Sequence, residues 1–130
     1  DRRIIVLTGD GEMLMGIGAL ATAGVVSPAN FAICVIDNQH YGETGMQETH
    51  TSHGVDLPSI AAAAGFGETA TVWNKKELDS TIPLLYETKG PVFVAVKVTT
   101  DAVPMTLPIR DGTALRARFR ASILGDKAYH

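Results

Sequence analysis

The chain contains four short runs rich in apolar or β-branched residues, separated by longer segments of mixed character. The runs cover residues 3–8, 31–36, 69–73 and 92–98. The first two are almost continuously apolar, which is typical of strands that are buried on both faces of a parallel sheet. We therefore predict four strands, the first two of them covered on both sides.

The segments between these runs carry the signals of helices. Residues 12–25 are rich in Ala, Gly and Met, with small residues at helical spacing. Further helices are predicted over 59–64, 74–89 and 113–124, with end signals at Asp56 and Pro58, at Asn74 and Glu77, and at Gly125. The alternation of strands and helices predicts a three-layer α/β/α fold with a mostly parallel, doubly wound sheet.

The length of 130 residues fits one domain, 1–130, to which we assign residues 101–130 as a C-terminal extension. Residues 37–56 form a long polar segment without periodicity, directly after a predicted strand. Loops of this length in compact domains are usually functional or disordered. Because this one starts at a strand end, we expect it to be functional.

Composition narrows the class of protein. Hydrophobic residues make up 45%, charged residues 19%, and the formal net charge is −3, which gives no reason to expect a nucleic-acid partner. Residues 13–36 carry no charge, but Gly16, Gly24 and Pro28 interrupt the stretch, so a packed small-residue helix explains it better than a membrane span. The single Cys34 lies in a predicted strand, which fits a reducing, cytoplasmic location. Since the chain opens on Asp1 without a visible signal peptide, we treat its start as truncated or processed.

Two polar tips follow the first two predicted strands. Asp10 stands between two glycines after the first strand, and Asn38 follows the second, with residues 12–37, or 26 positions, between Gly11 and Asn38. Neighbouring parallel strands place such tips at one sheet edge, where ligands bind in open α/β sheets. A carboxylate, an amide oxygen and nearby backbone carbonyls suit Mg²⁺ holding a phosphate. Each of these polar tips alone is typical of a common turn. Their combination at this spacing indicates a metal and phosphate site far more specifically.

The pattern Gly-Asp-Gly, 26 residues, then Asn resembles the diphosphate-binding motif of thiamine diphosphate enzymes. That resemblance implies that Mg²⁺ is held by the side chains of Asp10 and Asn38 and by the carbonyl of His40. It also implies cofactor contacts from a wider set, namely Gly9, Asp10, Gly11, Glu12, Asn38, His40, Tyr41, Gly42 and Thr44. The family's usual Asn-Asn pair reads Asp37-Asn38 here, which leaves the ligand position itself unchanged.

The stretch from Asp37 to Thr49 resembles more narrowly the decarboxylases of sulfopyruvate and phosphonopyruvate. This resemblance implies a thiamine diphosphate- and Mg²⁺-dependent decarboxylase of an anionic 2-keto acid, in which the cofactor carries the chemistry. It also implies an oligomer with a pyrimidine-binding domain or subunit that supplies a Glu to the cofactor. The apolar helix 12–25 either packs on that partner or covers its own sheet. A carboligase of the acetolactate synthase type and a non-catalytic cofactor-binding or assembly module are the alternatives.

Three histidines and a group of arginines complete the candidates. His50 and His53 are candidates for substrate binding or proton relay, as histidine titrates near neutral pH; with His40 they are alternatively ligands of a transition metal, or plain loop residues. Thr44, Gln47 and Thr49 are expected to bond the cofactor or the loop backbone. The basic residues near the C-terminus are Arg110, Arg116, Arg118 and Arg120. Of these, Arg116 and Arg120 share a helix face that meets an anion, a partner or solvent.

Overall fold

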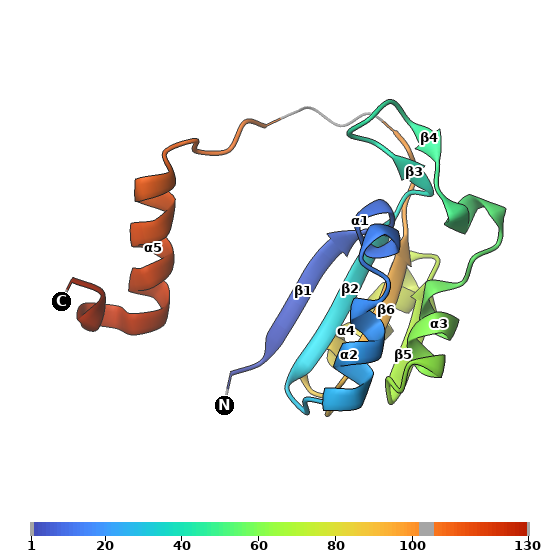
Figure 1. The fold of residues 1–130 in the computed structure, drawn as a ribbon, viewed down its shortest axis with the longest axis horizontal. Coiled ribbons are helices and arrows are strands. Elements are labelled where there is room, and N and C mark those ends of the chain that lie inside the picture. Colours follow the sequence, from blue (N-terminus) through green and yellow to red (C-terminus); the bar gives the residue numbers. More distant parts are fainter. Residues whose placement is uncertain (1, 102–105, 130) are drawn as a thin grey trace. The chain divides into compact units, whose positions relative to one another are not determined.

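Four parallel strands form the central sheet of the protein. The computed structural model describes residues 2–101 and 106–129 (Figure 1). The strands stand in the order β1, β2, β6, β5. Their bounds are β1 Ile4–Gly9, β2 Phe31–Asp37, β5 Glu68–Val72 and β6 Val92–Lys97. In the registers, Gly9 lies beside Ile36, and Asp37 lies beside Lys97. The ends of β1, β2 and β6 therefore meet at one edge, and the sequence had predicted this for β1 and β2.

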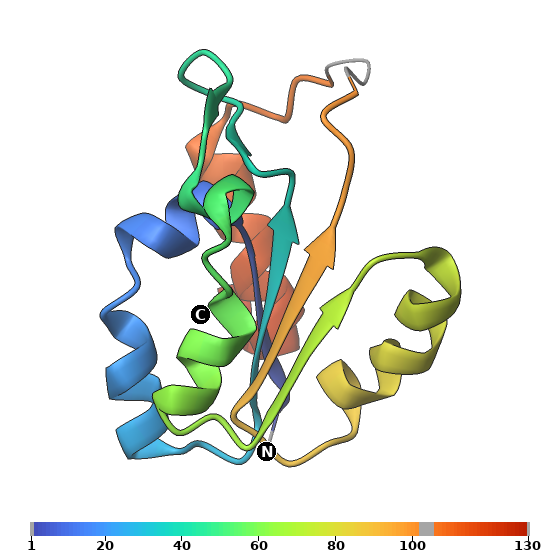
Figure 2. The same ribbon diagram turned by 90° about the vertical axis from the view of Figure 1, so that its right-hand side faces the viewer.

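Helices cover both faces of this sheet and make three layers (Figure 2). The helices of this part are α1 Asp10–Met15, α2 Ala19–Val26, α3 Leu57–Ala63 and α4 Lys75–Tyr86. Side chains of α1, α2 and α3 pack with Ile33, Val35 and Phe93 of the sheet. The α4 side chain Leu85 packs on the other face with Cys34 and neighbouring strand residues. The predicted α/β/α fold class is thus confirmed.

Strand β1 differs from the prediction because it is not covered on both faces. It pairs only with β2 and lies at the end of the sheet order. Ile4 is 52% exposed and Leu7 is 70% exposed, whereas Ala32 to Val35 of β2 are buried. The apolar run identified a strand correctly. The number of neighbours that strand has depends on the sheet order, which an apolar run does not specify.

The helix predicted over 12–25 is two helices in the structure. α1 ends at Met15, and α2 begins at Ala19 after a turn that contains Gly16 and Gly18. Glycine costs about 1 kcal/mol relative to Ala inside a helix, so two glycines within three residues favour a break. α2 buries Leu20 against the sheet but leaves Val25 and Val26 exposed.

The segment 37–56 is more ordered than the sequence indicated. It contains a small antiparallel pair, β3 His40–Tyr41 and β4 Gln47–Glu48, followed by the 3₁₀ turn η1 His50–His53. Gly45 and Met46 both have positive φ in the connection between the strands. The pair lies beyond the ends of β1 and β2 (Figure 1). Strands of two residues are too short to be read from a sequence pattern.

Most predicted helix ends are confirmed. The Asp56 side chain accepts a hydrogen bond from the Ser59 N–H at 3.2 Å, and Asn74 accepts one from the Glu77 N–H at 3.0 Å. In the C-terminal part, α5 Gly112–Leu124 begins after the Asp111 cap and ends at Gly125, followed by the 3₁₀ turn η2 Gly125–Tyr129. The chain up to Thr100 and the part from Asp101 onward form separate compact units. Parts of the proposed extension, 102–105 and 130, lie outside the described residues.

The acidity of the buried cysteine and the apolar character of the helices are two further properties of the structure. Burial raises the pKa of the Cys34 thiol, because the charged thiolate is disfavoured in the core. Among the residues described, none of the helices combines the length and the apolar character needed to cross a membrane.

Gly24 gives a direct test of the packing between α2 and α3. A Cβ at Gly24 would lie 1.7 Å from the Ala64 carbonyl oxygen, whereas one at Gly18 meets nothing within 4 Å. We expect Gly24→Ala to lower the free energy of unfolding by about 1–3 kcal/mol, as overpacking does. Gly18→Ala is the matched control and should leave stability unchanged. Urea unfolding measures both, and equal stability of the two variants would contradict the packing described.

Candidate functional site

A buried carboxylate lies at the centre of the candidate site. Asp10, the first residue of α1, is only 2% exposed. Its Oδ2 atom accepts a hydrogen bond from the Thr49 hydroxyl at 2.5 Å and contacts the Thr51 hydroxyl at 3.3 Å. The two threonine hydroxyls are 2.9 Å apart. Because a buried carboxylate needs donors, these contacts fix the segment after β4 to the end of β1.

A second buried acid, Asp37, lies beside the first. Asp37 is 1% exposed, and its Oδ1 accepts hydrogen bonds from the Thr51 hydroxyl at 2.8 Å and the Gln39 N–H at 3.0 Å. Its Oδ2 pairs with the Lys97 ammonium at 2.5 Å. Thr51 therefore connects the two acids, and Lys97 compensates the charge of Asp37.

The residues after Asp37 form a tight turn. Gln39 has φ 64°, a left-handed conformation that is uncommon for residues other than glycine. The Asn38 Oδ1 accepts the His40 N–H at 2.9 Å, and the His40 carbonyl accepts the Gly42 N–H at 3.1 Å. Gln39 is held by Thr51 as well, since its side-chain amide donates to the Thr51 carbonyl at 3.1 Å. Asn38 and the His40 carbonyl thus belong to one fixed turn.

The other predicted cofactor residues have local partners. A Cβ at Gly11 would lie 2.7 Å from the ring of Tyr41, so glycine is needed here for the contact between α1 and β3. The Glu12 carboxylate accepts the Gly9 N–H at 2.8 Å. The Thr44 hydroxyl donates to the Gln47 side-chain oxygen at 3.1 Å near the tip of the β3–β4 pair. The side chains expected to bond the cofactor or the loop backbone were Thr44, Gln47 and Thr49. The Thr49 hydroxyl instead donates to the Asp10 carboxylate.

The loop histidines do not gather around one point. The His53 Nε2 lies 3.0 Å from a Glu48 carboxylate oxygen, and the His40 Nδ1 lies 3.0 Å from the Asn38 carbonyl oxygen. In the described part of the chain, no group of three or more His, Cys, Asp or Glu side chains is arranged to hold a metal. The alternative of a histidine site for a transition metal therefore has no geometric basis in those residues.

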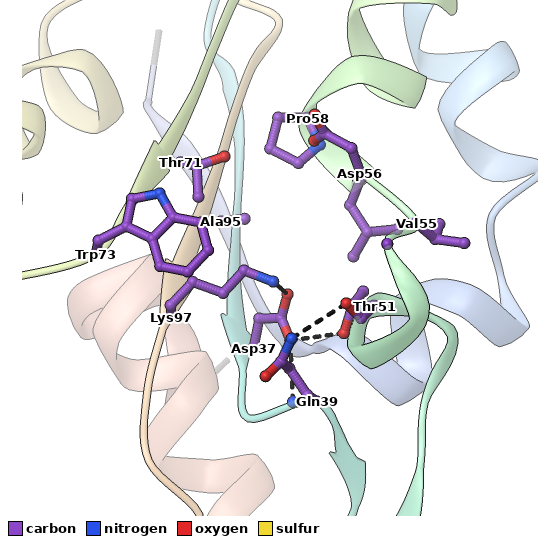
Figure 3. A pocket seen from close by; sticks show the side chains of 12 residues that line it. Asp37, Gln39, Thr51, Val55, Asp56, Pro58, Thr71, Trp73, Ala95 and Lys97 are labelled. Carbon is purple, nitrogen blue, oxygen red and sulfur yellow. Dashed lines mark hydrogen bonds and ion pairs between the residues drawn. The ribbon is translucent and has the colours of Figure 1, made fainter.

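A cavity of about 210 Å³ opens beside Asp37 (Figure 3). Its polar walls include Asp37, Gln39, Thr51 and Lys97, and Trp73 forms one side. Trp73 is 67% exposed, and the Lys97 ammonium lies 5.5 Å from the centre of its ring. Trp73 is therefore not a core residue, although the apolar run that ends with it suggested a core or an interface position.

The oxygen atoms at this edge suit a hard cation. Hydrogen bonds from the described residues reach only Oδ2 of Asp10, so Oδ1 keeps its lone pairs. The Asn38 Oδ1 and the His40 carbonyl oxygen each accept one hydrogen bond, and each keeps a second lone pair. Carboxylate, amide and carbonyl oxygens are ligands that Mg²⁺ accepts. The donor set therefore fits the metal that the motif implies.

A comparison with protein families identifies the family of this chain. The profile of the family described as thiamine pyrophosphate enzyme, C-terminal TPP binding domain, matches residues 1–96. The chain belongs to this thiamine pyrophosphate enzyme family. Thiamine pyrophosphate is the same molecule as thiamine diphosphate, so the match bears out the cofactor that the motif predicted. The matched range contains both strand tips and the turn between Asn38 and Gly42.

Several curated relatives resemble this thiamine pyrophosphate-binding chain. The sulfopyruvate decarboxylase subunit beta of Methanocaldococcus jannaschii is 38% identical over 94 residues, covering 72% of this chain and 50% of the relative. The corresponding subunit of Methanothermobacter thermautotrophicus is 33% identical over 125 residues, which is 96% of this chain and 64% of the relative. The phosphonopyruvate decarboxylase of Streptomyces viridochromogenes is 32% identical over 123 residues, covering 94% and 31%. The chain thus spans about a third to two thirds of these relatives.

Sequence reasoning missed two residues of this site, Thr51 and Lys97. Thr51 lies on the 3₁₀ turn η1, two positions after Thr49, and no sequence pattern indicated that the two hydroxyls meet. Lys97 ends β6 in register with Asp37 at the end of β2. Opposite charges at the ends of two predicted parallel strands were the available signal, but using it required knowing that β2 and β6 are neighbours.

The Thr49 hydroxyl provides a test of the hydrogen bonds around Asp10. We expect Thr49→Val to lower the free energy of unfolding by about 1–3 kcal/mol, because a buried carboxylate loses its closest donor. Thr44→Val removes an exposed hydroxyl of the same kind and should cost less than about 0.5 kcal/mol. Thermal and urea unfolding measure both changes. If the two variants were equally stable, the Thr49–Asp10 bond would not hold the loop.

Proposed function

We propose that the chain is the diphosphate-binding half of a thiamine diphosphate- and Mg²⁺-dependent decarboxylase of an anionic 2-keto acid. The observation that carries the proposal is the buried Asp10 carboxylate, with Oδ2 bonded by the Thr49 hydroxyl and Oδ1 without a hydrogen bond from the described residues. The family match over residues 1–96 supports the cofactor. Relatives named sulfopyruvate and phosphonopyruvate decarboxylase support the type of reaction and substrate.

In this proposal, Asp10, Asn38 and the His40 carbonyl hold Mg²⁺, which binds the diphosphate of the cofactor. The bound cofactor supplies the electron sink for loss of carbon dioxide from a 2-keto acid. The chain contributes binding and orientation: Asp10 neutralises the cation, and the turn at Asn38 fixes the position of two oxygen ligands. Gly9 and Gly11 bracket Asp10, and Tyr41 packs against Gly11 to keep the turn and α1 together.

The proposal includes a second, pyrimidine-binding domain or subunit, and an oligomer that contains both. The name subunit beta of the methanogen relatives supports a separate partner chain. The exposed apolar side chains Met15, Val25 and Val26 on α1 and α2 support contact through these helices. The other side of α2 covers its own sheet through Leu20, so the two interpretations of this segment are compatible. We place the assembled enzyme in the cytoplasm.

The anionic substrate requires cationic or hydrogen-bonding groups close to the cofactor. His50 and His53 lie on η1, directly after Thr49, and stay the candidates for substrate binding or proton transfer. Arg116 and Arg120 lie one turn apart on α5, where Arg120 donates to the Ala128 carbonyl at 3.3 Å. Contact of these arginines with an anion or with a partner is proposed as the alternative to a purely solvated face.

Cofactor binding tests the proposal. With its pyrimidine-binding partner present, the protein should bind thiamine diphosphate in calorimetry when Mg²⁺ is saturating, and EDTA should abolish the binding reversibly. Asp10→Asn should weaken binding by more than about 100-fold, because the loss of a direct ligand exceeds the effect of losing a supporting residue. Asp126→Asn, a change on η2, is the control. An assembled complex that shows no binding at saturating Mg²⁺ would reject the proposed function.

Product analysis tests the reaction. We expect the assembled enzyme to release carbon dioxide from sulfopyruvate or phosphonopyruvate with the corresponding aldehyde as product, and to use pyruvate poorly, since pyruvate lacks the second anionic group. Formation of a carbon–carbon bond from two pyruvates would instead identify a carboligase. Cofactor binding without turnover of any 2-keto acid would identify a non-catalytic module.

A further inference from the structure

We propose that Asp37, which belongs to neither the predicted metal ligands nor the predicted cofactor contacts, is a positioning residue for both halves of the metal site. This inference rests on the proposed function, since the groups it positions are the proposed ligands Asp10, Asn38 and the His40 carbonyl. One carboxylate oxygen of Asp37 accepts a hydrogen bond from Thr51, which packs against Asp10, and a second one from the turn that carries the other two ligands.

The first connection runs through Thr51 to Asp10. The Thr51 hydroxyl lies 2.8 Å from Asp37 Oδ1, 3.3 Å from Asp10 Oδ2 and 2.9 Å from the Thr49 hydroxyl. A hydroxyl has one hydrogen, and the shortest of the three contacts gives it to Asp37. The Thr49 hydrogen then goes to Asp10 at 2.5 Å. Both hydrogens then go to the two acids, so the Thr51 oxygen only packs against Thr49 and Asp10, and Asp37 fixes Thr51 beside the Thr49 hydroxyl that holds Asp10 Oδ2.

The second connection runs through the backbone of Gln39 to the turn. Asp37 Oδ1 accepts the Gln39 N–H at 3.0 Å, next to a residue whose φ is 64°. A left-handed conformation at a residue with a side chain costs about 1–2 kcal/mol, so it persists only where neighbours hold it. This conformation lets the His40 N–H reach the Asn38 side chain at 2.9 Å. Asp37 therefore stabilises the turn that presents two of the proposed ligands.

Lys97 fixes Asp37 itself. The Lys97 ammonium binds Asp37 Oδ2 at the end of the neighbouring strand β6, so Oδ1 is directed to Thr51 and Gln39 (Figure 3). Only 18% of the Lys97 side chain is exposed, and the pair lies at the wall of the cavity beside Trp73. A pair this buried keeps its geometry better than an exposed one, because water competes less for each partner.

The key role in this arrangement belongs to an acceptor oxygen at position 37, and the charge serves to anchor it. Asparagine has the same shape, and its Oδ1 can accept both hydrogen bonds. Alanine has neither acceptor. Comparing the two substitutions therefore separates positioning through Oδ1 from a general effect of removing a buried charge.

The experiment measures metal affinity in the assembled protein with its pyrimidine-binding partner, with thiamine diphosphate saturating and Mn²⁺ as a paramagnetic stand-in for Mg²⁺. We expect Asp37→Asn, whose amide nitrogen faces Lys97 in place of a carboxylate oxygen, to bind Mn²⁺ more weakly than wild type but more tightly than Asp37→Ala. Asp37→Ala should weaken binding by about 10- to 100-fold, the usual effect of removing a group that orients a metal ligand. The matched control is Asp79→Ala, which breaks an exposed ion pair with Lys75 on α4 and should leave Mn²⁺ affinity unchanged.

The outcomes separate this inference from the proposed function. Wild-type protein that binds no Mn²⁺ and no thiamine diphosphate rejects the proposed function. Wild-type binding together with a folded Asp37→Ala variant of equal affinity rejects only the role of Asp37. An equal loss of affinity in Asp37→Asn and Asp37→Ala rejects it as well.

If Asp37→Ala does not fold, Thr51→Val replaces it. We expect weaker Mn²⁺ binding in this variant and recovery in Thr51→Ser, and wild-type affinity in Thr51→Val would overturn the inference.

Discussion

The bond between the buried Asp10 carboxylate and the Thr49 hydroxyl is the contact on which the candidate site depends. A carboxylate that is 2% exposed is stable only if hydrogen-bond donors compensate its burial. Thr49 supplies one from 39 residues further along the chain, and Thr51, 41 residues from Asp10, packs beside it. Satisfying this one charge therefore folds a distant polar segment over the edge of the sheet.

The rest of the segment 37–56 follows from that attachment. With Thr49 and Thr51 fixed, Gln39 bonds both of them, through its carbonyl to the Thr49 N–H and through its side chain to the Thr51 carbonyl. The chain between them closes as the short β3–β4 pair, with Gly45 and Met46 in left-handed conformations. A polar stretch without periodicity thus acquires a defined shape from hydrogen bonds to two buried acids.

The same chain leaves apolar surface uncovered elsewhere. Leu7 on the edge strand and Val25 and Val26 on α2 are each more than two thirds exposed. Such surface is typical of positions where another protein element packs. In the proposed function, metal binding and partner binding would occupy different parts of one domain, the sheet edge and the α1–α2 face.

The sequence by itself determined the four strands, the helix caps at Asp56 and Asn74, and the pair of tips at Asp10 and Asn38, because these depend on local periodicity, capping chemistry and spacing. It could not give the exposure of β1 or the break in helix 12–25, which depend on sheet order and packing. The roles of Thr51 and Lys97 were equally out of reach. Asp37 meets Lys97 only because β2 and β6, 60 residues apart at these positions, became neighbours. Contacts between residues so far apart along the chain are set by the tertiary fold alone, since no local pattern encodes which strands will pair.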